Sequence, residues 1–249
     1  MQIFAISDLH LSISTPEKDM KDFGKTWENY QEKIKSNWEK TVTDNDLVLV
    51  PGDICWAIKL KDALLDLEWI HELPGKKVII RGNHDYWWPS ASKLKEALPP
   101  SISFIQNSSL LFGDVSIAGS RLWDTTEYNF NEYINFVYNP KQRKDLQENI
   151  QEDLSEKIFA REIERLKLSL EKLDKNAKTK IVMTHYPPIS ADLKDSKVSK
   201  LLEKYNVDIC IFGHLHNLKR EKKMFGEKNN IKYILTSADY INFNPIKIL

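Results

Sequence analysis

Short apolar runs that end in polar residues set strong limits on the fold of this chain. Runs of this kind occupy residues 3–6, 47–50, 78–80, 181–184 and 209–212. They are typical of strands buried on both faces of a parallel sheet. Each is followed closely by Asp, Asn, His or Gly, and five of the six histidines lie within four residues of the end of a run. Because chemistry collects at the carboxyl ends of strands in open α/β sheets, these five clusters are predicted to meet at one edge.

The remaining pattern predicts an α/β core. Two more strand-like runs lie at residues 115–119 and 233–236, and apolar residues spaced by three and four predict helices over 27–38 and 64–73, with a shorter one over 89–98. Alternation of strand and helix indicates βαβ units and a largely parallel sheet. The last part, residues 217–249, has strand and turn character, which predicts an antiparallel edge or a second sheet.

One segment interrupts this alternation. About sixty residues separate Gly119 from Lys180, whereas a crossover needs about 12. The segment begins with aromatic residues, and Pro140 then opens a long helical pattern, since proline suits the first turn of a helix. We interpret residues 120–178 as a helical insertion in a single domain that spans 1–249. Its role, as part of the site or only as a cover, stays open at this point.

Charge and cysteine content narrow the class of protein. The formal net charge of +0 over 249 residues gives no support for a nucleic-acid or membrane partner, although a basic patch over residues 219–232 would be compatible with nucleic acid. No apolar stretch approaches the ~20 residues that span a bilayer, and no secretory signal is visible. Cys55 and Cys210 fit no zinc-ribbon or disulfide framework. We therefore expect a cytoplasmic protein.

The residues after the runs are good metal donors. Histidine is the commonest metal ligand, and the pair His214 and His216 lies just past a predicted buried strand. Carboxylate oxygen and imidazole nitrogen suit Mn, Fe, Co or Zn, and the absence of thiolates disfavours a structural zinc. The clusters are Asp8-x-His10, Gly52-Asp53, Gly82-Asn83-His84-Asp85, His185 and His214-x-His216. Together they contain enough donors for two metal ions.

In this order the motifs resemble the calcineurin-like metallophosphoesterase family, from Asp8 to His216. The resemblance implies a four-layer α/β sandwich of two mixed β-sheets flanked by helices. It also implies two divalent ions, with Mn²⁺ the first choice in vitro. The implied ligands of one ion are Asp8, His10 and His216, and those of the other are Asn83, His185 and His214. Asp53 would bridge both ions.

The resemblance further implies hydrolysis of a phosphomonoester or phosphodiester by in-line attack of a hydroxide that two metal ions activate. His84 resembles the family's catalytic histidine, which donates a proton to the leaving oxygen or stabilises the phosphoryl group, and Asp85 is expected to orient it. The segment from Gly52 to Trp56 lacks the further Asp and Arg of the phosphoprotein phosphatase branch. This favours the bacterial-type branch of phosphodiesterases and small-molecule phosphatases.

The sequence defines the contacts to the phosphate-ester substrate less closely than it defines the metal ligands. Arg81 and Arg121 are candidates for phosphate contacts because a guanidinium matches phosphate oxygens. Trp56 and Trp123 lie near the motifs, where they would stack on a base, wall the metal site and exclude water, or pack the insertion. A nuclease or cyclic-nucleotide phosphodiesterase is therefore an alternative function. A non-catalytic interaction scaffold is another, but none of the motif residues is missing. The oligomeric state is not predicted.

Overall fold

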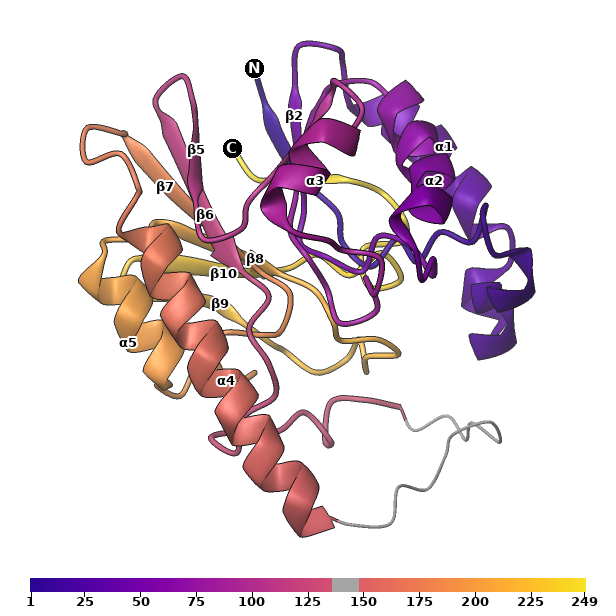
Figure 1. The fold of residues 1–249 in the computed structure, drawn as a ribbon. Helices are drawn as coiled ribbons and strands as arrows, with labels where there is room; N and C mark the ends of the chain where they lie inside the picture. The colour runs from indigo at the N-terminus through magenta and orange to yellow at the C-terminus, as the bar shows by residue number, and fades with distance from the viewer. Residues whose placement is uncertain (136–147) are drawn as a thin grey trace.

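Two β-sheets pack face to face between two layers of helices (Figure 1). The computed structural model describes residues 1–135 and 148–249. In the first sheet the strand order is β11-β1-β2-β3-β4, formed by Ile246–Lys247, Ile3–Ala5, Leu47–Val50, Lys76–Ile79 and Ile102–Phe104. In the second it is β5-β6-β7-β8-β10-β9, formed by Ser109–Phe112, Val115–Ser120, Thr179–Thr184, Ile209–Phe212, Ile231–Leu235 and Gly226–Lys228. The inner strands of both sheets are parallel, and β11, β5 and β9 pair antiparallel at the edges.

Alternate residues of each strand divide between two cores, because side chains along a strand point to opposite faces. In β2, Leu47 and Leu49 lie in the core between the sheets, whereas Val48 and Val50 face the outer helices. In β8, Ile209 and Ile211 likewise face the inner core. Both faces of the central strands are therefore buried, which explains their continuous apolar runs. The four-layer α/β architecture expected from the sequence is confirmed.

Each helical layer covers one sheet. The helices α1 (Tyr30–Thr41), α2 (Leu60–Glu72) and α3 (Ala91–Ala97) cover the first sheet, and α4 (Glu148–Leu170) and α5 (Lys197–Lys204) cover the second (Figure 1). Three short 3-10 turns, η1 (Pro16–Lys18), η2 (Met20–Phe23) and η3 (Lys25–Trp27), precede α1.

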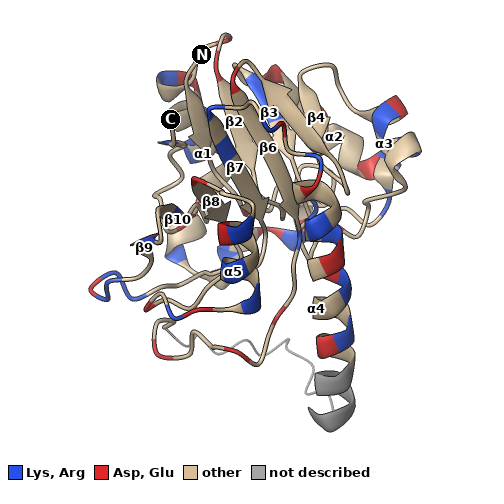
Figure 2. Ribbon diagram, turned by 90° about the vertical axis from the view of Figure 1, so that its left-hand side faces the viewer, with Lys and Arg blue, Asp and Glu red and all other residues tan. Residues whose placement is uncertain are grey.

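Figure 2 shows basic and acidic residues mixed along α4 and around β9. Within the part of the chain that the structure describes, no helix is both long and apolar enough to cross a bilayer.

Some elements differ from the sequence-based expectation. Strand β10 begins two residues earlier than expected and ends at Leu235, and α1 begins at Tyr30 rather than near Trp27. The short strands β4 and β5 and the helix α5 were not predicted. The insertion contains the helix α4, which packs on β6 through Leu166 and Leu170. The expected helix start at Pro140 lies outside the described residues.

The carboxyl ends of both sheets meet at one edge. The N–H of Ser7, just after β1, donates to the carbonyl of Thr236, just after β10, at 2.8 Å, and the two segments form a parallel bridge. The N–H of Asp8 donates to the carbonyl of Gly52, after β2, at 3.0 Å. The first bond joins loops of the two sheets, and the second joins neighbouring loops of the first sheet, where the polar clusters lie.

Candidate metal centre

Strained backbone marks the loops that carry the donor clusters. Asp8, His10, Asp53 and His214 have φ angles of 57°, 44°, 54° and 73°. Non-glycine residues rarely adopt this left-handed region, at a cost of about 1–3 kcal/mol each where strain is stored. Hydrogen bonds between the loops hold the conformation, among them His10 N to the Asp53 carbonyl at 3.0 Å and His214 N to Asp8 Oδ1 at 3.0 Å. Such clustering of strain is typical of functional sites.

The first donor group consists of Asp8, His10 and His216. One ligand atom from each lies within 4.8 Å of the others. His10 Nε2 and His216 Nε2 are 3.3 Å apart, and His216 Nε2 is 3.7 Å from Asp8 Oδ1. Asp8 and His10 are buried. These are the three residues that the family resemblance assigns to one ion.

The second donor group surrounds His185. Its Nε2 lies 3.4 Å from Asp53 Oδ2 and 2.6 Å from Asn83 Oδ1. The same amide oxygen is 3.1 Å from His214 Nδ1. A carboxylate or imidazole atom from each of Asp8, Asp53 and His185 also lies within 4.8 Å of the others. The structure therefore brings Asn83, His185 and His214 together, with both aspartates beside them.

Asp53 lies between the two groups. Its Oδ2 is 3.7 Å from His10 Nε2 in the first group and 3.4 Å from His185 Nε2 in the second. Its Oδ1 accepts a hydrogen bond from the backbone N–H of His84 at 2.8 Å. A single carboxylate oxygen thus faces an imidazole of each group, which is the position that a bridging ligand needs.

Outer hydrogen bonds orient the donor side chains. Asp239 Oδ1 lies 2.8 Å from His216 Nδ1, the Pro51 carbonyl lies 3.0 Å from His185 Nδ1, and Ser7 Oγ donates to Asp8 Oδ2 at 2.6 Å. Partners of this kind fix the ring orientation of metal-binding histidines. The sequence analysis missed Asp239, although its place four residues after β10, at the same sheet edge, was a usable signal.

The electrostatics of the buried donors suit a divalent cation. Burial raises the pKa of Asp8 to about 6, and burial together with neighbouring Asp85 raises that of Asp53 well above its usual value. Burial lowers the pKa values of His10 and His185, so their rings are neutral and offer lone pairs. Burial also opposes protonation of His216, but the Asp239 and Asp8 carboxylates raise its pKa to about 9. Positive charge at this site would offset the cost of burying the carboxylates. The donor set therefore fits divalent metal ions.

Two glycines allow the loops to approach closely. A Cβ on Gly82 would overlap the backbone nitrogen and the carboxylate of Asp53. Gly52 has a φ of 88°, and its Cβ would lie 2.8 Å from both Gly82 Cα and His185 Nδ1. Glycine is needed at both places because backbone or donor atoms occupy the space of a side chain.

We expect Gly82→Ala to destabilise the protein and to disorganise the donor groups, because Asp53 must move to accommodate the methyl group. The free energy of unfolding should fall by about 3 kcal/mol or more, the upper end for overpacking. Gly113→Ala is the control: nothing lies within 4 Å of its Cβ and only its φ of 60° opposes the change, at about 1–2 kcal/mol. Denaturant unfolding of both variants measures the difference, and equal losses would contradict the close approach.

His84 lies beside the donor groups without belonging to either. Its ring centroid is 5.5 Å from that of His10 and 4.6 Å from that of Trp56. Burial lowers its pKa to about 4. Trp56 stacks on His10 at 4.9 Å with an interplanar angle of 22°. Trp56 is therefore at the site, in contact with the rings of both histidines.

Asp85 does not have the expected orientation toward His84. Its carboxylate is completely buried and accepts hydrogen bonds from the backbone N–H groups of Gly82, Asp53 and Ile54 at 2.7, 3.0 and 2.9 Å. It also accepts one from Trp87 Nε1 at 3.1 Å. Backbone N–H groups of two strand-end loops take up its oxygens, so Asp85 joins these loops instead of orienting the His84 ring.

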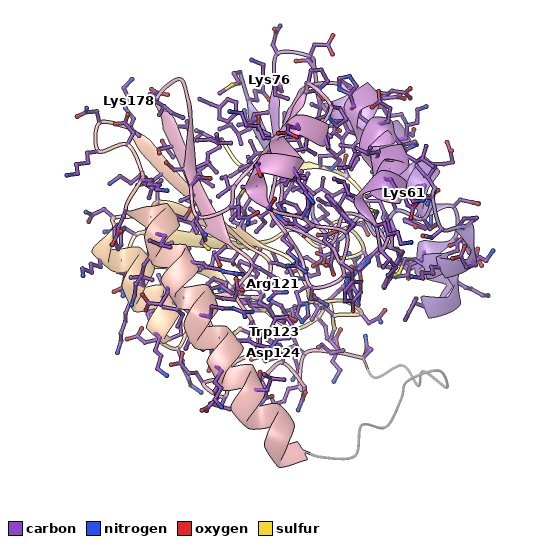
Figure 3. All side chains as sticks on the ribbon, viewed as in Figure 1. Lys61, Lys76, Arg121, Trp123, Asp124 and Lys178 are labelled. Carbon is purple, nitrogen blue, oxygen red and sulfur yellow. The ribbon has the colours of Figure 1, made fainter. Side chains whose placement is uncertain are left out.

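Arg121 and Trp123 follow β6 and lie close together near α4 (Figure 3). The Arg121 guanidinium stacks over Trp123 at 4.5 Å and forms an ion pair with Glu162 at 3.3 Å. Trp123 lines a cavity of about 310 Å³ that His214 also lines. The Tyr186 ring in the same cavity lies 3.9 Å from the His214 ring. Trp123 thus reaches a space next to the second donor group, whereas Arg121 is engaged by α4.

Comparison with known proteins identifies the family to which this chain belongs. A model of the calcineurin-like phosphoesterase family matches residues 1–218, and the chain belongs to this family. It is therefore a metal-dependent phosphoesterase. The fold is shared with a phosphopantetheinyl hydrolase from Mycobacterium tuberculosis, at 13% identity and a TM-score of 0.52, over 100% of this chain and 95% of the other. A protein of unknown function from Aquifex aeolicus has 18% identity and a TM-score of 0.49, with 99% and 95% coverage. No curated protein matches significantly.

Proposed function

We propose that the protein hydrolyses a phosphomonoester or phosphodiester at a centre of two divalent ions. The observation that carries the proposal is the position of Asp53, whose Oδ2 faces His10 Nε2 at 3.7 Å and His185 Nε2 at 3.4 Å. In this proposal Asp8, His10 and His216 would hold one ion, Asn83, His185 and His214 would hold the other, and Asp53 would be a ligand of both. Bound divalent ions would supply Lewis acidity that polarises the phosphoryl oxygens and activates a water molecule as nucleophile.

The remaining residues have supporting roles in the proposal. His84 is neutral above a pH of about 4, so its ring N–H donates a hydrogen bond to a phosphoryl or leaving oxygen. Trp56 limits the orientation of His84 by packing against it. Asp239 and Pro51 orient His216 and His185. Asp85 holds the loops that carry Asp53 and Asn83 in register.

The cavity beside His214 gives the organic part of the substrate a place to bind. Its lining includes the aromatic residues Trp123, Tyr128, Phe130 and Tyr186 and the polar residues Asp124, Asn129 and Asn131. Aromatic faces that stack on a base contribute about 1–3 kcal/mol per base. This cavity favours a second candidate function, a phosphodiesterase that acts on nucleotide or cyclic-nucleotide substrates.

We expect the purified protein, supplied with Mn²⁺, to hydrolyse bis-p-nitrophenyl phosphate or p-nitrophenyl phosphate, and to lose this activity when the metal is chelated. The ratio of kcat/KM for the two reporters separates diesterase from monoesterase. Thymidine 5′-p-nitrophenyl phosphate tests the second candidate, because a base that stacks in the cavity should raise kcat/KM over the simple diester. No hydrolysis of any reporter between pH 5 and 9 would favour the interaction-scaffold alternative.

A further inference from the structure

A second, smaller cavity of about 90 Å³ lies between the first sheet, β6 and α4. None of the proposed metal ligands lines it. Three arginines from three parts of the chain do: Arg81 after β3, Arg121 after β6 and Arg165 on α4. The other polar side chains in its lining are those of Gln106, Asn107 and Ser120, and the lining contains neither Asp nor Glu among the described residues. The cavity is therefore a concave surface of positive charge.

Arg81 and Arg121 each have a buried Nε without a hydrogen-bond partner. Arg81 is half-buried, and among the described residues no hydrogen bond or ion pair involves its guanidinium; its Nε is buried without a partner. The Arg121 side chain is only 11% exposed, and its Nε is also buried without a partner. Leaving a buried donor unsatisfied costs about 1–3 kcal/mol, and more for a charged group. The guanidinium of Arg81, which has no partner among the described residues, is the group left to bind a ligand with acceptor oxygens.

Glu162 neutralises only part of the charge. Its carboxylate, 2% exposed, pairs with Arg121 at 3.3 Å and Arg165 at 2.7 Å. It also lies 3.7 Å from Arg161. Ser120 Oγ donates to Glu162 Oε2 at 3.2 Å, which fixes the acid against β6. One carboxylate thus holds two of the cavity arginines in place, while Arg81 stays without a counter-ion among the described residues.

We propose that this cavity binds a tetrahedral oxyanion of the phosphate or sulfate class, at a position separate from the metal centre. Guanidinium groups match the oxygens of such anions in paired, charge-assisted hydrogen bonds. The cavity has space for several water molecules, hence for one small oxyanion. The anion is either a second acidic group of the substrate, since Arg81 is two residues from Asn83, or a free ion that binds independently of substrate.

Inorganic sulfate is the probe, because its binding to the metal-loaded protein is measurable by calorimetry without turnover. With sodium chloride as the ionic-strength control, we expect Arg81→Gln and Arg165→Gln each to weaken sulfate binding about tenfold or more, the effect of losing a charge-assisted hydrogen bond. Arg161→Gln is the matched control, because it removes the same charge near Glu162 from a side chain that does not line the cavity. Equal sulfate affinity in all four proteins would overturn the proposal.

Kinetics then identify the source of the anion. If it is a second group of the substrate, Arg165→Gln raises the KM for phosphate release from adenosine 3′,5′-bisphosphate about tenfold relative to adenosine 5′-monophosphate. If it is a free ion, both KM values respond alike, and sulfate changes kcat for the wild-type protein but not for Arg165→Gln. An inactive protein that still binds sulfate through Arg81 and Arg165 would contradict the proposed function and leave the anion site in place.

Discussion

Replacing Asp53 with Asn is expected to lower metal occupancy at both donor groups at once. Removal of outer-shell partners typically weakens metal binding 10–100-fold, so loss of a bridging carboxylate should weaken it by about 100-fold or more. Turnover should fall with occupancy. Metal content after equilibration with limiting Mn²⁺, measured by mass spectrometry, and the rate of reporter hydrolysis give the two readouts.

The substitution is informative because it changes charge with little change in shape. The Asn side chain keeps an oxygen that accepts the His84 N–H, as Asp53 Oδ1 does at 2.8 Å. It replaces Oδ2, which faces His10 and His185, with an amide nitrogen that has no lone pair to donate. The loops should therefore keep their register while the shared ligand is lost.

Asp46→Asn is the matched control. Asp46 is also buried, and its carboxylate accepts hydrogen bonds from Gln2 N and the Thr43 hydroxyl, with no part in either donor group. Its loss should lower stability without changing metal content. If Asp53→Asn retained two ions and normal turnover, the bridging role would be wrong.

The sequence predicted the convergence of the donor clusters because a simple physical rule connects pattern and position. A run such as residues 209–212 is apolar on both faces only if the strand is buried between two layers. Residues that follow parallel strands must then lie at the same edge. Within the first sheet this rule places Asp8, after β1, at the same edge as Asp53, after β2. The approach of His185, after β7 in the second sheet, to Asp53 at 3.4 Å depends in addition on how the two sheets pack.

Features that depend on tertiary packing were not predictable in the same way. The bonds of the Asp85 carboxylate are made to backbone N–H groups, which leave no signal in residue type. Strands β4 and β5 are short and lie at sheet edges, where apolar periodicity is weak. The cavity arginines lie together only because α4 packs on β6. The sequence around Arg165 therefore did not indicate that it lies near Arg121.

Replacing His84 with Ala is expected to lower kcat about 10²–10³-fold, in the range for loss of one positioned donor in a transition state, while metal content stays unchanged. The ring is not part of either donor group, and its nearest ring neighbours are Trp56 and His10. Mass spectrometry of the metals and steady-state kinetics on the same preparation test both halves of the expectation.

The pH profile separates the two roles that the family resemblance leaves open for His84. With a pKa near 4 in the free protein, the ring gains a proton only as the pH falls through 4, and it is neutral from pH 5 to 9. Hydrogen-bond donation by the neutral ring therefore predicts a wild-type to His84→Ala ratio of kcat/KM that is constant over this range. Proton donation by the charged ring predicts a ratio that falls as the pH rises. His71→Ala is the control, since His71 lies on α2 and contacts Ser101. If His84→Ala lost metal and His71→Ala did not, His84 would instead be a metal ligand.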